Sequence, residues 1–194
     1  MPNTGTVTES SFRIGLARAF YAKRQSNGKY DTPVEFEFPE ECDIKINGGD
    51  AQSIYAGDAS RWRKAGATSK ELSVQMTHFK RSFLKDCLGF VAESTTGGIT
   101  DTGSGKAADF AFGIETTGDQ GAYRQWFFCC TATTPVHKAQ TNTDNIQEDS
   151  ETSTFTAVPV KCGDGVTRID TTFETGDSGY ETAFSAVPFQ GAGA

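Results

Sequence analysis

Two stretches of sequence decide the fold of this chain: YRQWFFCC at residues 123–130 and STFTAVPV at residues 153–160. In an extended strand, Trp126 and Phe128 of the first stretch fall on one face and Phe127 falls on the other. Because both faces are apolar, the pattern predicts a strand that is covered on both sides. In the second stretch Pro159 removes a ladder donor, which suits a strand end or an edge.

Other parts of the chain show the same two-residue period. We expect further strands at Phe12–Ala22, Pro33–Phe38, Ala51–Ala56, Leu72–Met76, Phe110–Ile114, Val166–Glu174 and Tyr180–Val187. Ile44 and Ile46 continue the alternation, and the sequence Asn47-Gly48-Gly49-Asp50 predicts a tight turn that makes its flanking strands antiparallel neighbours.

The period changes to that of a helix between His78 and Leu88. Phe79, Phe83 and Leu88 fall on one stripe of this segment, so it predicts a helix of about three turns laid on a sheet. Thr77 is the candidate N-cap and Gly89 the candidate C-cap.

The order of these patterns resembles that of the major tail proteins, or tail tube proteins, of siphovirus-type phages with long tails. The resemblance runs from about Ile14 to Phe184 and includes FYA, TPVEFEF, IYAGD, FKRSFLKDCLG, WFFCCTAT and STFTAVPV in that order. It implies a mainly β fold, an antiparallel β-sandwich or barrel-like tail tube domain with one short flanking α-helix at about residues 78–88. It also implies hexameric rings that stack into a hollow tube for DNA delivery.

Length and composition agree with a single domain made mainly of strands. A chain of 194 residues can bury roughly 70% of its unfolded surface in one core. The 15 Phe and 21 Gly residues favour strands joined by flexible turns. We expect one domain over residues 1–194, with a mobile N-terminal arm at about 1–11 and a mobile C-terminal tail at about 190–194.

The chain is acidic: 18 Lys and Arg against 25 Asp and Glu give a net charge of −7. This charge disfavours a dedicated nucleic-acid binder. In a tube that conducts DNA, acidic walls repel phosphate within a Debye length of about 8 Å, whereas basic walls would hold it.

The five cysteines include no C-x-x-C pair, and their odd number favours reduced thiols in a core over a disulfide framework. The first residues have neither a basic start nor an apolar stretch. We therefore expect synthesis in the host cytoplasm, followed by a place in the tail of the virion.

Three features of the sequence could suggest a chemical function, but a structural role explains each of them better. Gly103-Ser104-Gly105-Lys106 lacks the first glycine and the final Ser or Thr of a phosphate loop, so an exposed connection explains it better. His78 and His137 lack companion ligands or a nucleophile nearby in the sequence, and the acidic run at 144–151 lacks EF-hand spacing. We expect no catalytic residues, no cofactor and no metal.

Two sets of residues are candidates for contact with other molecules. Because a tryptophan beside basic residues is typical of interfaces, the polar segment 57–69 is predicted to be a loop that docks a neighbouring subunit through Arg61, Trp62, Arg63 and Lys64. The candidate lumen-facing acids are Glu35, Glu37, Asp50 and Asp58.

The sequence therefore predicts a structural virion protein that is not an enzyme and that self-assembles into stacked hexameric rings. Its expected partners are identical copies, a tape measure protein and a tail terminator, with DNA passing through unbound and no membrane insertion. Two alternatives stay open: a head-tail joining or tail terminator protein, and a β-sandwich carbohydrate-binding module.

Overall fold

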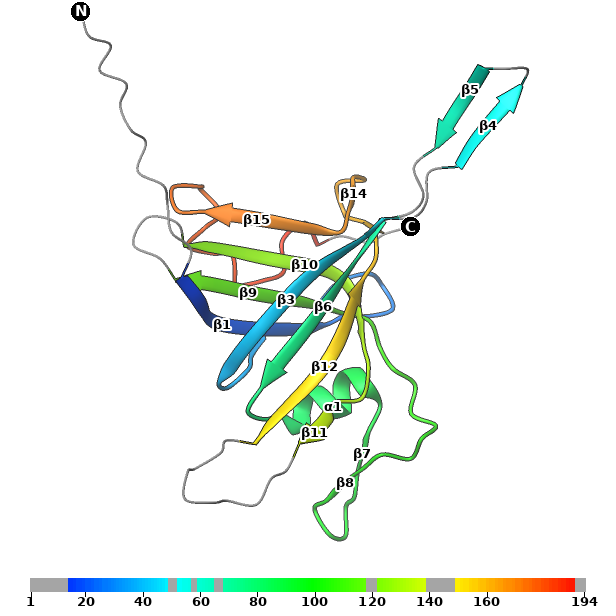
Figure 1. The fold of residues 1–194 in the computed structure, drawn as a ribbon. Coiled ribbons are helices and arrows are strands. Elements are labelled where there is room, and N and C mark those ends of the chain that lie inside the picture. The colour runs from blue at the N-terminus through cyan, green and yellow to red at the C-terminus, as the bar shows by residue number, and fades with distance from the viewer. Residues whose placement is uncertain are drawn as a thin grey trace, which may run out of the picture.

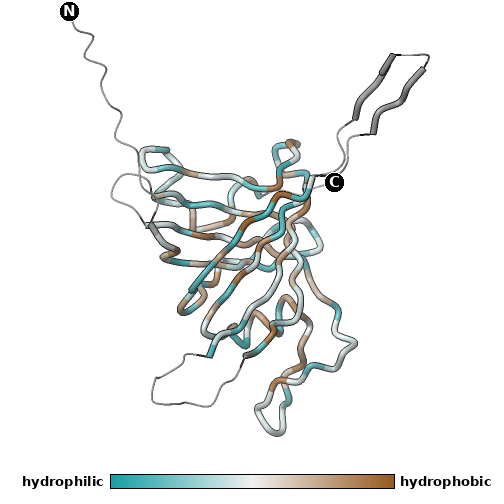
Figure 2. Tube along the Cα trace, viewed as in Figure 1, coloured by the Kyte–Doolittle hydropathy of each residue, from teal (hydrophilic) through white to brown (hydrophobic). Residues whose placement is uncertain are grey.

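The computed structural model describes residues 14–48, 68–117, 122–138 and 149–190, and the backbone alone of 52–56 and 59–64. These residues are mainly β-structure in antiparallel sheets, with one short helix (Figure 1), as the sequence predicts. Hydrophobic and hydrophilic residues alternate along the strands (Figure 2), which is the pattern of sheets with one face in a core.

The elements have the following bounds. The strands are β1 (Ile14–Lys23), β2 (Val34–Glu35), β3 (Pro39–Gly48), β4 (Gln52–Ala56), β5 (Ala59–Lys64), β6 (Thr68–Met76), β7 (Val91–Ala92), β8 (Ile99–Thr100), β9 (Phe110–Thr117), β10 (Tyr123–Ala132), β11 (Val136–Lys138), β12 (Ser150–Ala157), β13 (Val160–Lys161), β14 (Thr167–Arg168) and β15 (Asp170–Glu174). The helix is α1 (Arg81–Leu88).

The main sheet has the strand order β2-β1-β9-β10-β12-β6-β3, and all its pairs are antiparallel. Strand β15 also pairs with β10, and β11 pairs with β12. Three small hairpins, β4–β5, β7–β8 and β13–β14, complete the described strands.

Strand β10 belongs to both layers of the fold. Its first half, residues 123–127, pairs with β15, whereas residues 130–132 pair with β12. A bulge lies between these halves, and Cys129 within it has a φ of 48°. Such a bulge bends a strand, and Figure 1 shows β3, β6 and β12 crossing the layer formed by β1, β9, β10 and β15.

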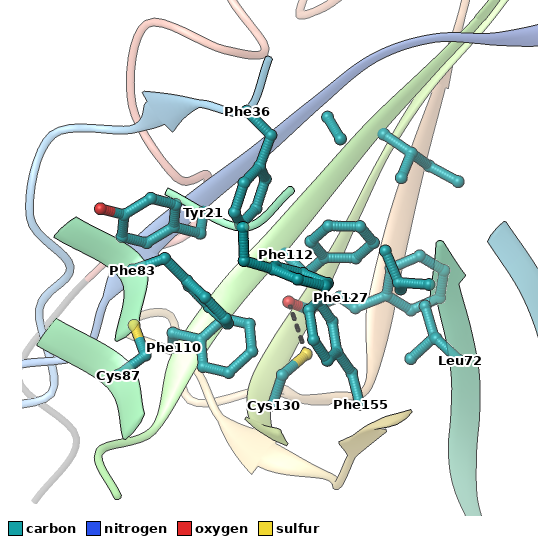
Figure 3. Close-up of a cluster of buried hydrophobic side chains, with 14 of the residues drawn as sticks. Tyr21, Phe36, Leu72, Phe83, Cys87, Phe110, Phe112, Phe127, Cys130 and Phe155 are labelled. Atoms are coloured by element: carbon teal, nitrogen blue, oxygen red, sulfur yellow. Dashed lines mark hydrogen bonds between the residues drawn. The ribbon is translucent and has the colours of Figure 1, made fainter. Parts of the chain in front are cut away.

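The larger core lies between the two layers and is rich in aromatic rings (Figure 3). Helix α1 contributes Phe83, whose ring centroid is 5.2 Å from that of Phe110 and 5.7 Å from that of Phe155. Phe155 is fully buried and also packs edge-to-face on Phe112 at 4.9 Å. These rings fill the space that the crossing sheets leave between them.

A second, smaller core covers the opposite face of β1, β9 and β10. It contains Phe20, Trp126 and Phe128, so β10 is buried on both faces as predicted. Residues 175–190, here called the C-terminal strap, cover this face with turns, so the strand predicted at 180–187 is wrong. The indole Nε1 of Trp126 donates a hydrogen bond to the backbone carbonyl of Ala183 at 2.7 Å. In a strand, a backbone carbonyl would accept from a neighbouring strand instead.

Helix α1 starts later than its pattern suggests. Lys80 is the N-cap residue and makes no side-chain capping bond, so Thr77 does not have the predicted role. The Thr77 hydroxyl instead donates to Glu40 at 3.0 Å. Gly89 ends the helix with a φ of 75°, as predicted.

Strand partners differ from the prediction near the turn at 47–50. Strand β3 pairs with β6, and β4 pairs with β5, so β3 and β4 are not the expected neighbours. The reason is that the β4–β5 hairpin is inserted in sequence between the two strands of the longer β3–β6 hairpin. The predicted strand at 33–38 is also cut to Val34–Glu35, since only Phe36 of its predicted apolar face is buried and Phe38 is exposed.

Candidate interaction surface

Strand β3 forms an edge of the main sheet. It pairs with β6 over its whole length, and no described strand pairs with its other side. An edge strand of ten residues offers a row of backbone N–H and C=O groups that another strand can pair with.

The apolar face of β3 extends beyond the layer that should cover it. Ile44 lies opposite Leu72 in the ladder, so the two side chains share one face of the sheet. Leu72 is fully buried, but Ile44 is 37% exposed and Ile46 is 69% exposed. The core between the layers is therefore left open along β3.

An open groove marks this place, between the start of β1 and the first half of β3. Its apolar lining includes Leu16, Ile114 and Ile44, and Glu40 and Glu41 also line it. Cys42, between the acids and Ile44, is half-buried, and burial raises the pKa of its thiol to about 12, so the thiol stays neutral.

Phe38 stands at the entry to β3 and is 69% exposed. Its φ of 54° is a left-handed conformation that costs a residue with a Cβ about 1–2 kcal/mol. Its carbonyl accepts a bond from the Thr77 N–H at 3.4 Å. An aromatic ring held outward at such a cost is typical of a contact surface.

The predicted acids Glu35 and Glu37 are both paired with cations. Arg18 donates to both carboxylate oxygens of Glu35, at 2.6 and 2.9 Å, and Lys80 lies 2.9 Å from Glu37. The hydrogen bond from Arg18 lowers the pKa of Glu35, and that from Lys80 lowers the pKa of Glu37. These carboxylates are neutralised locally, so they do not form a bare acidic face. Asp50 and Asp58 lie outside the described residues.

The predicted docking residues Arg61, Trp62, Arg63 and Lys64 are in a strand and not in a loop. They belong to β5, which pairs with β4, and the structure describes only their backbone. Sequence reasoning passed over β3 as a contact surface because Ile44 and Ile46 alternate like residues of any half-buried strand. The free edge of β3 has no signal of its own in the sequence.

Gly105, directly before Lys106, has a packing role. A Cβ on Gly105 would collide with the backbone carbonyl of Gly89, at the end of α1. The chain then leads into β9, whereas a phosphate loop opens a helix. The backbone at Gly105 therefore packs closely against the backbone at Gly89, and this contact explains the glycine.

Gly105→Ala is expected to lower the free energy of unfolding by about 1–3 kcal/mol, because backbone atoms cannot move aside as a side chain can. Urea denaturation measures this change. Gly98→Ala is the matched control, since its Cβ would meet only the Thr96 hydroxyl at 3.4 Å, and it should change stability by less than about 0.5 kcal/mol. Equal effects of the two substitutions would contradict the packing role of Gly105.

The described residues contain no cluster of three or more His, Cys, Asp or Glu side chains placed to hold a metal ion. His137 lies beside Glu151, with 3.5 Å between Nδ1 and Oε1, on an exposed strand. The five cysteines are free thiols. Among the described residues, no helix has the length and apolar character needed to span a bilayer.

No model of a known protein family matches this chain, and no curated protein sequence matches it either.

Proposed function

We propose that this chain is a structural protein that assembles with copies of itself into the tail tube of a phage. The observation that supports this most is the state of β3. No described strand pairs with the outer edge of this ten-residue strand, and Ile44 and Ile46 on its apolar face are exposed. A second copy that paired with this edge would cover both the backbone groups and Ile44 and Ile46.

Stacked rings, hexameric by the resemblance, are the arrangement that we propose for these copies. An edge that pairs with a different surface of the next copy makes a head-to-tail contact, and such contacts close into a ring when the rotation between copies allows it. The net charge of −7 suits a channel through which DNA passes without binding. A tape measure protein inside the tube and a terminator at its end are the further proposed partners.

Negative-stain electron microscopy of the concentrated protein tests this function. Tubes of uniform width are the expected result, and the virion tail is then the proposed location. Single rings that never stack would favour a head-tail joining or terminator protein. A protein that remains monomeric at all concentrations would contradict assembly, and glycan binding by that monomer would favour a carbohydrate-binding module.

A further inference from the structure

The two ends of β1 carry features of opposite charge. The groove described above lies at its N-terminal end and includes Gly15, Glu40 and Glu41. At the other end, just past Lys23, an open hollow is lined by Arg24, Gln25, Ser26, Lys106, Ala107, Ala108 and Asp109.

Among the described residues, no cationic side chain pairs with the acids at the groove. Glu40 accepts bonds from two uncharged groups, the Gln75 amide at 2.7 Å and the Thr77 hydroxyl at 3.0 Å. Glu41 is exposed and has no ion-pair partner among the described residues. Glu41 lies opposite Gln75 in the ladder and the Glu40 carboxylate is bonded to Gln75, so both acids lie at the β3 rim of the groove, whereas Cys42 and Ile44 face its apolar lining from the other side of the strand.

The hollow carries cationic groups that are only partly satisfied. The Arg24 Nε is buried and makes no hydrogen bond to any described residue. Arg24 Nη1 lies 3.7 Å from Asp109 Oδ2, which is a long ion pair, and that carboxylate also accepts from the Cys129 thiol at 3.6 Å. Lys106 is exposed and has no ion-pair partner in the described part of the chain. An incoming carboxylate would meet the Lys106 ammonium and, beside it, the Arg24–Asp109 ion pair.

One molecule cannot bring these two features together. Gly15 and Arg24 are nine positions apart on an extended strand, which separates the groove from the hollow by about 30 Å. The acids at one end and the cations at the other can meet only across two molecules.

We infer that the groove end of one copy docks on the hollow end of the next, with Glu40 and Glu41 facing Arg24 and Lys106. This inference rests on the proposed self-assembly and names its contact. The contact joins two different surfaces, so it is heterologous and repeats from copy to copy. Opposite charges at the two ends also oppose groove-to-groove and hollow-to-hollow pairing, which fixes the direction of assembly.

A charge-swap experiment tests this contact. The variants Glu41→Lys and Lys106→Glu each place like charges across it, so each alone should require at least a tenfold higher concentration than the wild type to assemble. An equimolar mixture should assemble again, because the two variants can alternate. At one contact the two introduced side chains face each other with opposite charges, and at the next the native Glu41 faces the native Lys106. Light scattering and negative-stain microscopy measure the particles.

Two further readouts check the same contact. Hydrogen–deuterium exchange of the backbone at residues 40–42, which line the groove, should slow when wild-type protein assembles and should stay unchanged in either variant alone. Sodium chloride at 1 M, where the Debye length is about 3 Å, should raise the concentration that the wild type needs. Glu93→Lys and Lys85→Glu make the same charge changes on exposed residues elsewhere and should assemble as the wild type does.

The outcomes separate this inference from the proposed function. If the wild type assembles and either charge-reversal variant assembles equally well, or if the folded variants do not assemble on mixing, the contact is wrong and self-assembly stands. If the wild type never assembles, both are wrong. Near-ultraviolet circular dichroism checks that each variant folds. Where a charge-reversal variant does not fold, the neutral variant at the same position, Glu41→Gln or Lys106→Gln, replaces it. Weaker assembly of the neutral variant is the expected result, and unchanged assembly would contradict the contact.

Discussion

Replacing Phe155 with alanine is expected to lower the free energy of unfolding by about 3–5 kcal/mol. Phe155 is fully buried in β12, and its ring lies 4.9 Å from that of Phe112 and 5.2 Å from that of Phe110. The position faces both sheet layers and helix α1, so neighbouring side chains cannot collapse into the space that the ring leaves. The loss is a large part of the stability of a typical domain, which is about 5–15 kcal/mol.

Urea denaturation measures this change, and the midpoint should fall without a change in the m-value. The control is Val136→Ala on β11, where the side chain is 72% exposed, and its effect should be below about 0.5 kcal/mol. A loss below about 1 kcal/mol for Phe155→Ala would contradict a core that is built around this ring.

Replacing Trp126 with alanine is also expected to cost about 3–5 kcal/mol, and here the effect has a second part. Trp126 is fully buried in the smaller core, and its indole holds the C-terminal strap through the 2.7 Å bond to Ala183. Its ring also packs on Phe184 at 5.7 Å. Loss of the indole should therefore free the strap before the rest of the domain unfolds.

Limited proteolysis followed by mass spectrometry locates this release. Cleavage within residues 175–190 should become faster in Trp126→Ala, while the main sheet stays protected. Trp126→Phe is the matched control, because it keeps an aromatic ring and removes only the N–H donor. The Ala183 carbonyl is then left without its donor, which should lower the free energy of unfolding by about 1–3 kcal/mol. If the strap is cleaved at the same rate in Trp126→Ala and the wild type, Trp126 does not hold it.

The faces of most strands could be predicted from the sequence. Leu72, Val74 and Met76 are fully buried, as their alternation indicates, and Phe110, Phe112 and Ile114 are buried too. Alternation gives the face of a strand, since its period is fixed by the backbone. It does not give the partner, and so the pairing of β3 with β6 could not be predicted.

The bulge in β10 could not be predicted either. It moves the alternation by one residue, so Phe127 and Cys130 enter the same core. Cys129 takes the positive φ that this bend needs, although cysteine has no special preference for it. The requirement comes from joining two layers, which is a property of the whole fold and not of the local sequence.

The exposure and the charge of the candidate surface could not be predicted either, because both depend on contacts between distant parts of the chain. Ile44 and Ile46 read like core residues, and only the extent of the opposite layer leaves them exposed. Glu35 and Glu37 read like a bare acidic face, but their partners Arg18 and Lys80 come from other parts of the chain. Composition and alternation carry no information on either point.

Hydrogen–deuterium exchange of β3 tests the central claim most directly, which is that identical copies complete this edge. Every second N–H of β3 faces away from β6 and has no described strand partner. These groups should exchange rapidly in dilute protein and at least tenfold more slowly in concentrated, assembled protein, while those of β6 stay protected in both. Equal exchange of β3 in dilute and concentrated samples would contradict the account.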